Sequence, residues 1–178
     1  MVSHLKKEIL ELELRNKIYN FVNKYAGSHL RELERKSKIP YSTLKYHLHY
    51  LVKHNLIIEK IGSKNSKYYP KTIASDDIEI LGLLRQKNIR KIILFILISN
   101  KCTLRDLEEF TILSPSTVSW YLNGLTKKGI IKKTKIGKKT IYKLIYKKEQ
   151  IMKILVTYKE SFFDYLVDKT IEMWEFKP

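Results

Sequence analysis

The chain has 178 residues, 44% of them hydrophobic, a net charge of +17 and a sequence isoelectric point near 9.8. The hydrophobic content excludes a disordered tail, and the longest strongly apolar run, Ile92–Ile98, is too short to cross a bilayer. The single cysteine, Cys102, excludes an intrachain disulfide and a multi-thiolate metal site. Since the N-terminal residues also lack the apolar core of a signal peptide, we expect a cytoplasmic protein with no membrane segment.

The positive charge is concentrated in two places. Nine Lys or Arg and one acid lie between Arg35 and Lys71, and ten Lys and no acid lie between Lys127 and Lys148. A merely solvated or heat-adapted surface would mix both signs, although the Lys-, Ile- and Glu-rich composition hints weakly at an archaeal or thermophilic source. The charge therefore predicts a polyanionic partner, chromosomal DNA above all.

The predicted elements run in chain order from helices to a hairpin, twice. An apolar first helix spans 16–26 with an extension over 3–15, a short second helix spans 29–37, and a third begins at Tyr41. Two short apolar runs around a Gly-containing turn then predict a β-hairpin. A connecting helix over 74–87 leads to the second series, which ends before 148.

The two series match at an ungapped offset of 74 residues. Ser42 and Thr43 fall on Ser116 and Thr117, and "LREL" at 30–33 falls on "LRDL" at 104–107. A repeat of this length predicts two domains of one type. We expect a first domain over 1–73, the connecting helix over 74–87, a second domain over 88–147 and a C-terminal amphipathic helix over 148–178.

Local signals mark the ends of the predicted helices. Thr103 stands three residues before Asp106, as in a capping box, and Ser114 before Pro115 is a good helix start. Asn55 and Gly129, at equivalent repeat positions, suit a left-handed end to the third helix. The fold class expected is therefore mainly α with small β-hairpins, an α+β architecture.

Each series resembles a winged helix-turn-helix domain. The stretches "PYSTLKYHLHYLVKHNLI" and "SPSTVSWYLNGLTKKGII" are similar to the recognition-helix region of MarR-like and ArsR-like transcriptional regulators, including archaeal ones. The resemblance implies two tandem winged helix-turn-helix domains with flanking helices. It also implies that the third helix enters the DNA major groove and that the hairpin is the wing.

The face of the third helix opposite its apolar stripe supplies the candidate DNA contacts. Hydroxyls near a helix N-terminus suit phosphate oxygens, Lys45 suits guanine, Asn123 suits adenine, and the two aromatics either pack on sugar or thymine methyl or cover the domain interior. The candidates are Tyr41, Ser42, Thr43, Lys45, Tyr46, His49, Lys53, Ser116, Thr117, Ser119, Trp120, Asn123 and Lys127.

The hairpins supply a second set of candidates, which the resemblance places beside the DNA backbone. Lysines there add affinity rather than sequence readout, unless the hairpins are merely solvated. The candidates are Lys60, Lys64, Lys67, Lys135, Lys138 and Lys139. Tyr68 and Tyr69 are expected to pack the first hairpin instead.

The sequence argues against an enzyme, a cofactor and a metal site. His47 and His49 face different ways on one helix and have no carboxylate or thiol partner nearby, and ArsR-like metal sensors carry thiolate motifs that are missing here. Gly62 and Gly137 are isolated and form no phosphate-binding loop, and no catalytic triad is legible around Cys102.

The C-terminal segment carries two neighbouring apolar stripes. Residues Ile151, Leu155 and Phe162 belong to one stripe, and Val167 and Trp174 belong to the other. A single helix with this surface needs cover, so we expect a homodimer through the C-terminal helix, the alternative being that terminal helices cover each other within one chain.

Three functions are compatible with these patterns. The first, which is the one we expect, is a tandem winged-helix transcriptional regulator that binds double-stranded DNA. The second is a winged-helix protein-interaction module, which has no need of basic recognition helices and wings. The third is a chromatin-like or single-strand binder without sequence specificity, favoured by the absence of arginine from both recognition helices.

Overall fold

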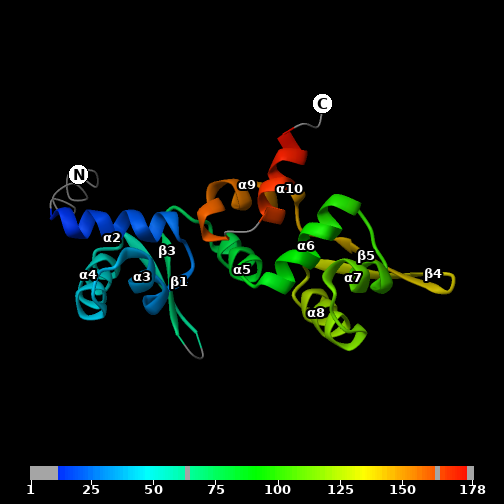
Figure 1. The fold of residues 1–178 in the computed structure, drawn as a ribbon. Coiled ribbons are helices and arrows are strands. Elements are labelled where there is room, and N and C mark those ends of the chain that lie inside the picture. Colours follow the sequence, from blue (N-terminus) through cyan, green and yellow to red (C-terminus); the bar gives the residue numbers. More distant parts are fainter. Residues whose placement is uncertain (1–11, 63–64, 163–164, 176–178) are drawn as a thin grey trace. The chain divides into compact units, whose positions relative to one another are not determined.

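A computed structural model describes residues 12–62, 65–162 and 165–175 (Figure 1). The chain divides into two compact units, Met1–Glu79 (unit 1) and Ile80–Pro178 (unit 2). The division falls inside helix α5 (Ser75–Leu84), within the range where the sequence predicts a connecting helix. The described residues are mainly helical with two small antiparallel sheets, as the sequence predicts.

The described part of unit 1 before α5 has three helices and a three-stranded sheet. Its elements are α2 (Glu13–Lys24), β1 (Ser28–His29), α3 (Leu30–Ser37), α4 (Tyr41–Lys53), β2 (Ile57–Ile61) and β3 (Ser66–Pro70). The strand order is β1-β3-β2, with Tyr68 opposite Ser28 on one side and Glu59 on the other. The expected helical extension over 3–15 lies mostly outside the described residues. The strand β1 is not predicted from the sequence, because two residues carry no periodic signal.

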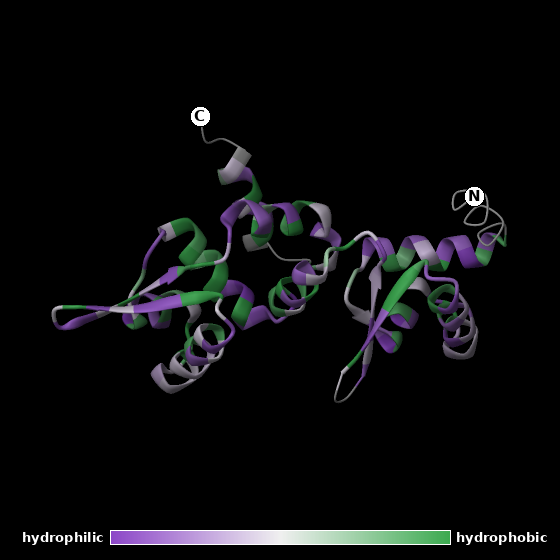
Figure 2. Cartoon of the chain, turned by 180° about the vertical axis from the view of Figure 1, so that it is seen from behind, coloured by the Kyte–Doolittle hydropathy of each residue, from purple (hydrophilic) through white to green (hydrophobic). Residues whose placement is uncertain are grey.

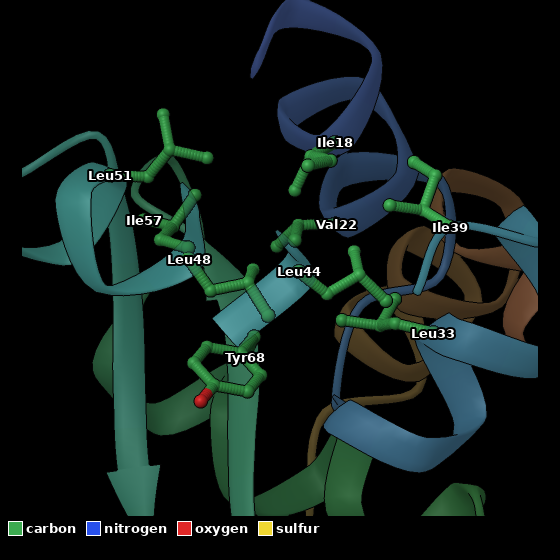
Figure 3. Close-up of a cluster of buried hydrophobic side chains, with 9 residues drawn as sticks. All are labelled: Ile18, Val22, Leu33, Ile39, Leu44, Leu48, Leu51, Ile57 and Tyr68. Carbon is green, nitrogen blue, oxygen red and sulfur yellow. The ribbon is translucent and has the colours of Figure 1, made fainter. Parts of the chain in front are cut away.

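The core of unit 1 lies where the three helices meet the sheet (Figure 3). The apolar stripe of α4, formed by Leu44, Leu48 and Leu51, is almost completely buried against Ile18 and Val22 of α2. Each such side chain contributes about 1.5–3 kcal/mol by leaving water. Burial of this stripe fixes which face of α4 remains exposed.

Unit 2 repeats the three helices and the hairpin of unit 1 in the same order. They are α6 (Lys87–Ser99), α7 (Leu104–Thr111), α8 (Pro115–Lys127), β4 (Ile131–Ile136) and β5 (Lys139–Leu144). In place of β1, Cys102 forms an isolated bridge with Tyr142, 74 residues after the pair Ser28 and Tyr68. Val118, Leu122 and Leu125 are the buried stripe of α8.

The helix ends follow the local signals of the sequence. Thr103 and Asp106 form a complete capping box, and the Ser114 hydroxyl accepts from the Thr117 N–H, with Pro115 in the first turn. Asn55 and Gly129 adopt left-handed φ values of 58° and 68°. The N–H of the next residue bonds to the carbonyl five residues back, Leu56 to Leu51 and Ile130 to Leu125, which satisfies a carbonyl in the last turn of α4 and of α8.

The prediction of a single C-terminal helix over 148–178 is wrong. The structure contains α9 (Lys148–Thr157), the 3₁₀ turn η1 (Lys159–Ser161) and α10 (Tyr165–Glu175). The chain leaves helical geometry at Tyr158, with φ −115° and ψ 28°, and α10 packs against both α6 and α9. Because of this break, residues of both apolar stripes, such as Leu155 and Val167, are buried within unit 2.

This packing reduces the apolar surface of the C-terminal segment that is left for the predicted homodimer. The apolar stripes that would cover a partner are mostly covered inside unit 2, although Val156 and Met173 stay exposed. No helix among the described residues is both long and apolar enough to span a membrane.

Candidate nucleic-acid interface

Helix α4 presents a polar, basic face opposite its buried stripe. Ser42, Lys45, Tyr46, His49 and Lys53 are all exposed and recur at helical spacings of three and four. Such a continuous face, about three turns long, is what a helix needs to reach into a DNA groove.

The N-terminus of α4 carries two further candidates, and one residue of α3 that the sequence analysis missed lies beside it. Tyr41 is exposed and Thr43 is half-buried. The guanidinium of Arg31, on α3, lies 4.5 Å from the centre of the Tyr41 ring and 3.1 Å from Glu34 Oε2. Arg31 therefore places a guanidinium beside α4, a helix that contains no arginine of its own. The signal was present in the repeated "LREL" and "LRDL", where Arg105 takes the same place in unit 2 and pairs with Glu109 at 3.0 Å.

Helix α8 presents the equivalent face in unit 2. Ser116, Trp120, Asn123 and Lys127 are exposed, and Thr117 and Ser119 are half-buried. At its start, the Ser114 hydroxyl lies 3.1 Å from that of Ser116 and 2.8 Å from that of Thr117. This hydroxyl cluster surrounds N–H groups of the first turn, where anions are favoured.

One large aromatic residue on each of α4 and α8, Tyr46 and Trp120, points outward. Tyr46 is 64% exposed and Trp120 is 68% exposed, and they occupy the same repeat position. The interpretation that these two aromatics cover the domain interior is therefore wrong. Each unit therefore presents one large aromatic side chain on the exposed face of its third helix.

The hairpin of unit 1 carries two of its three predicted lysines in direct opposition. Lys60 and Lys67 pair across β2 and β3; Lys60 is exposed and Lys67 half-buried, while Lys64 lies outside the described residues. Tyr68 and Tyr69 are buried, which confirms that they pack the hairpin. Burial and the neighbouring Glu59, whose Oε1 accepts from the Tyr68 hydroxyl at 3.3 Å, raise the pKa of Tyr68 to about 12.

The hairpin of unit 2 is more strongly basic. Lys135, Lys138 and Lys139 are exposed around the turn at Gly137, which has a φ of 59°. Hydrophilic residues predominate along β4 and β5 (Figure 2). The sequence analysis did not select Lys132 and Lys143, which are opposite each other and exposed. The acid-free run from 127 to 148 was the signal that could have included them.

His47 and Cys102 are buried. His47 is buried with no hydrogen-bond partner for Nδ1, and its pKa is lowered by burial and by Arg15, whereas His49 is exposed. Burial, with a smaller contribution from Asp106, raises the pKa of the Cys102 thiol to about 12, so it is a weak nucleophile. Among residues 12–62, 65–162 and 165–175, no three His, Cys, Asp or Glu side chains gather as metal ligands.

Comparison with known proteins points to the same elements. Residues 87–133, which cover α6, α7, α8 and the start of β4, match the family model of bacterial regulatory proteins of the arsR family. The chain is also 35% identical, over 149 residues and 83% of its length, to a protein of Methanocaldococcus jannaschii named as an uncharacterised HTH-type transcriptional regulator. The match spans only 37% of that longer relative.

These similarities agree with the element order and the exposed helix faces. The family match covers about a quarter of the chain, and it contains the helix-turn-helix pair α7 and α8 with their capping residues. The second half of the chain therefore contains a segment similar to the helix-turn-helix of arsR-family regulatory proteins.

Proposed function

We propose that the chain is a transcriptional regulator that binds duplex DNA through two winged helix-turn-helix units, one in each half. The observation that carries this proposal is that each unit has an exposed polar face on its third helix and a lysine-bearing hairpin after it, at the same 74-residue offset. The helix-turn-helix family match and the name of the archaeal relative support the same function.

The two kinds of surface have different tasks. The lysines of the hairpins neutralise phosphates and release counterions, which supplies affinity for any sequence. Lys45 on α4 and Asn123 on α8 suit guanine and adenine edges, and they supply the sequence readout. Since the two faces differ at most exposed positions, the two units would read different sequences.

Two units on one chain also strengthen weak contacts. Once one unit binds, the other acts at a high effective concentration, and avidity can exceed either single affinity by about 10²–10⁴-fold. Regulation would then follow from occupancy, as the bound chain blocks or recruits the transcription machinery. This function places the protein on the chromosome in the cytoplasm, without a cofactor or a catalytic step.

A gel-shift titration tests the proposal. It compares duplex from the protein's own upstream region, random duplex and single strand at two salt concentrations, for the wild type, Lys45→Ala/His49→Ala and Ser119→Ala/Asn123→Ala. We expect preference for the upstream duplex and a loss of about 1–3 kcal/mol per lost base contact in each variant. Lys153→Ala, an exposed lysine of α9 outside both faces, is the matched control and should bind as the wild type does.

The other outcomes separate the alternatives. Equal affinity for all duplexes, with a steep salt dependence, would indicate a sequence-independent architectural binder; α4 and α8 contain no arginine, which favours this second candidate. Preference for single strand would contradict the major-groove arrangement. Absence of binding at low salt would favour a protein-interaction module.

Homodimerisation remains a prediction of the sequence. Its remaining structural basis is the exposed Val156 and Met173 of the C-terminal helices. Sedimentation equilibrium of the full chain measures it directly, and a monomeric mass at micromolar concentration would contradict it.

A further inference from the structure

Unit 2 contains an open cleft beside the proposed DNA-reading helix. Its volume is about 450 Å³, within the range of small-molecule sites. The walls are mainly apolar and aromatic, formed by Leu83, Ile89, Trp120, Tyr121, Gly124 and Leu125. The polar groups at this cleft come from Gln86, Asn123, Lys127 and Lys128.

Gly124 lines the cleft with no side chain of its own. It lies in the middle of α8, where glycine costs about 1 kcal/mol relative to alanine. A Cβ built at this position meets no atom within 4 Å, so neither packing nor a left-handed backbone requires glycine there. A costly glycine without a structural reason points to a role for the space itself.

Unit 1 fills the corresponding place with an aromatic ring. Tyr50 stands 74 residues before Gly124, and its ring lies 3.9 Å from the Arg15 guanidinium and 4.2 Å from the His54 ring. Arg15 on α2 is the counterpart of Ile89 on α6. In unit 1 the ring of Tyr50 lies between the first and third helices. At the equivalent position of unit 2, which we call the slot, Gly124 supplies no side chain.

We propose that the cleft of unit 2 binds a planar aromatic small molecule that carries one anionic group. The ring would take the place that Tyr50 fills in unit 1 and pack against Ile89 and the aromatic side chains of α8. The anionic group would face the ammonium of Lys127, and the amide groups of Gln86 and Asn123, which also line the cleft, can donate hydrogen bonds.

The site overlaps the face assigned to DNA. Trp120, Asn123 and Lys127 line the cleft and also belong to the exposed face of α8. A ligand in the cleft would therefore compete with DNA for these side chains. This regulatory step rests on the proposed function, whereas ligand binding itself does not.

Fluorescence anisotropy of 2-naphthoate, titrated with the full chain without DNA, tests the binding site. We expect a dissociation constant of about 0.1–1 mM for the wild type, as for other fragments of this size. Gly124→Tyr copies unit 1 and fills the slot, and should weaken binding by about tenfold or more. Ile98→Tyr adds the same side chain at an exposed position of α6 outside the cleft and should leave binding unchanged.

A second slot-filling variant, a charge variant and two further ligands complete the test. Should Gly124→Tyr fail to fold, judged by circular dichroism, Gly124→Leu blocks the slot with a good helix former. Lys127→Gln should weaken naphthoate but not the neutral 2-naphthalenemethanol, and cyclohexanecarboxylate should bind more weakly than naphthoate. No binding below 5 mM (a limit roughly fivefold above the expected range), or equal binding by wild type and the slot-filling variant, would overturn the proposal.

The competition with DNA is measured separately. Saturating naphthoate should raise the concentration of wild type needed for half-maximal shift of the upstream duplex, and should have no effect on Gly124→Tyr. If naphthoate binds but does not affect DNA, the site stands and the regulatory step fails. If no DNA binds at all, the proposed function fails while the naphthoate titration still decides the site.

Discussion

Ile112 has an unusual backbone conformation for its residue type. It lies in the turn between α7 and α8 with a left-handed φ of 58°, and its side chain is 89% exposed. A β-branched residue is strained there because its side chain crowds the backbone, and exposure means that little burial offsets the strain. In unit 1 the equivalent turn residue is Lys38, which has a φ of 60° and no β-branch.

Ile112→Asn should stabilise unit 2. Asparagine tolerates the left-handed region, so we expect the free energy of unfolding to rise by roughly 1 kcal/mol. Urea denaturation at fixed pH measures the change. Ile112→Val keeps the β-branch and serves as the control, with no gain expected. A loss of stability in the asparagine variant would mean that the isoleucine side chain contributes contacts that outweigh the strain.

At the scale of single elements, the capping box of α7 closes a short helix. The Thr103 hydroxyl accepts from the Asp106 N–H at 3.3 Å, and the Asp106 carboxylate accepts from the Thr103 N–H at 2.8 Å. These bonds with Thr103 hold the pKa of Asp106 below its ordinary value. In unit 1, α3 is capped differently, by His29 Nδ1, which accepts from the Glu32 N–H at 3.2 Å.

Thr103→Ala should lower the free energy of unfolding by about 1 kcal/mol, because it leaves an N–H of the first turn without its acceptor. Thr103→Ser keeps the hydroxyl and should lose much less. The depressed pKa of Asp106 also predicts acid sensitivity: its contribution is present above pH 3.8, the ordinary value, and is lost as the pH falls through the folded-state pKa. Asp106→Asn should show a smaller loss of stability as the pH falls from about 5 to about 2, because the carboxylate loses its contribution mainly below its ordinary pKa of 3.8; an equal loss would contradict this assignment.

At the scale of the whole molecule, each unit has its own hydrophobic core. Leu48 and Leu122 occupy equivalent positions on α4 and α8, and they are 0% and 1% exposed. The core around Leu48 is formed within unit 1 by α2, α3, α4 and the sheet. This organisation predicts two units that open separately.

Leu48→Ala and Leu122→Ala test that organisation as a matched pair. Each removes a buried side chain and leaves a cavity, which costs about 2–5 kcal/mol. Native-state hydrogen exchange should show lost protection confined to the mutated unit. Equal loss of protection in both units after either change would indicate that the chain unfolds as one cooperative body.

Several parts of the fold could be predicted because their causes are local. The caps at Thr103 and Ser114, and the left-handed ends at Asn55 and Gly129, depend on hydrogen bonds within a few residues. The C-terminal break at Tyr158 could not, since no proline or glycine marks it, and it arises where two helices must both pack on unit 2.

The sequence by itself determined the repeat, the segregation of positive charge and the stripe of each third helix, because these depend only on the order of residues. The tertiary structure decided the exposure of Tyr46 and Trp120, the position of Arg31 over Tyr41 and the cleft at Gly124. Each of these depends on which side chains from different helices meet. Packing between elements, which no local pattern encodes, therefore defines the details of the candidate site.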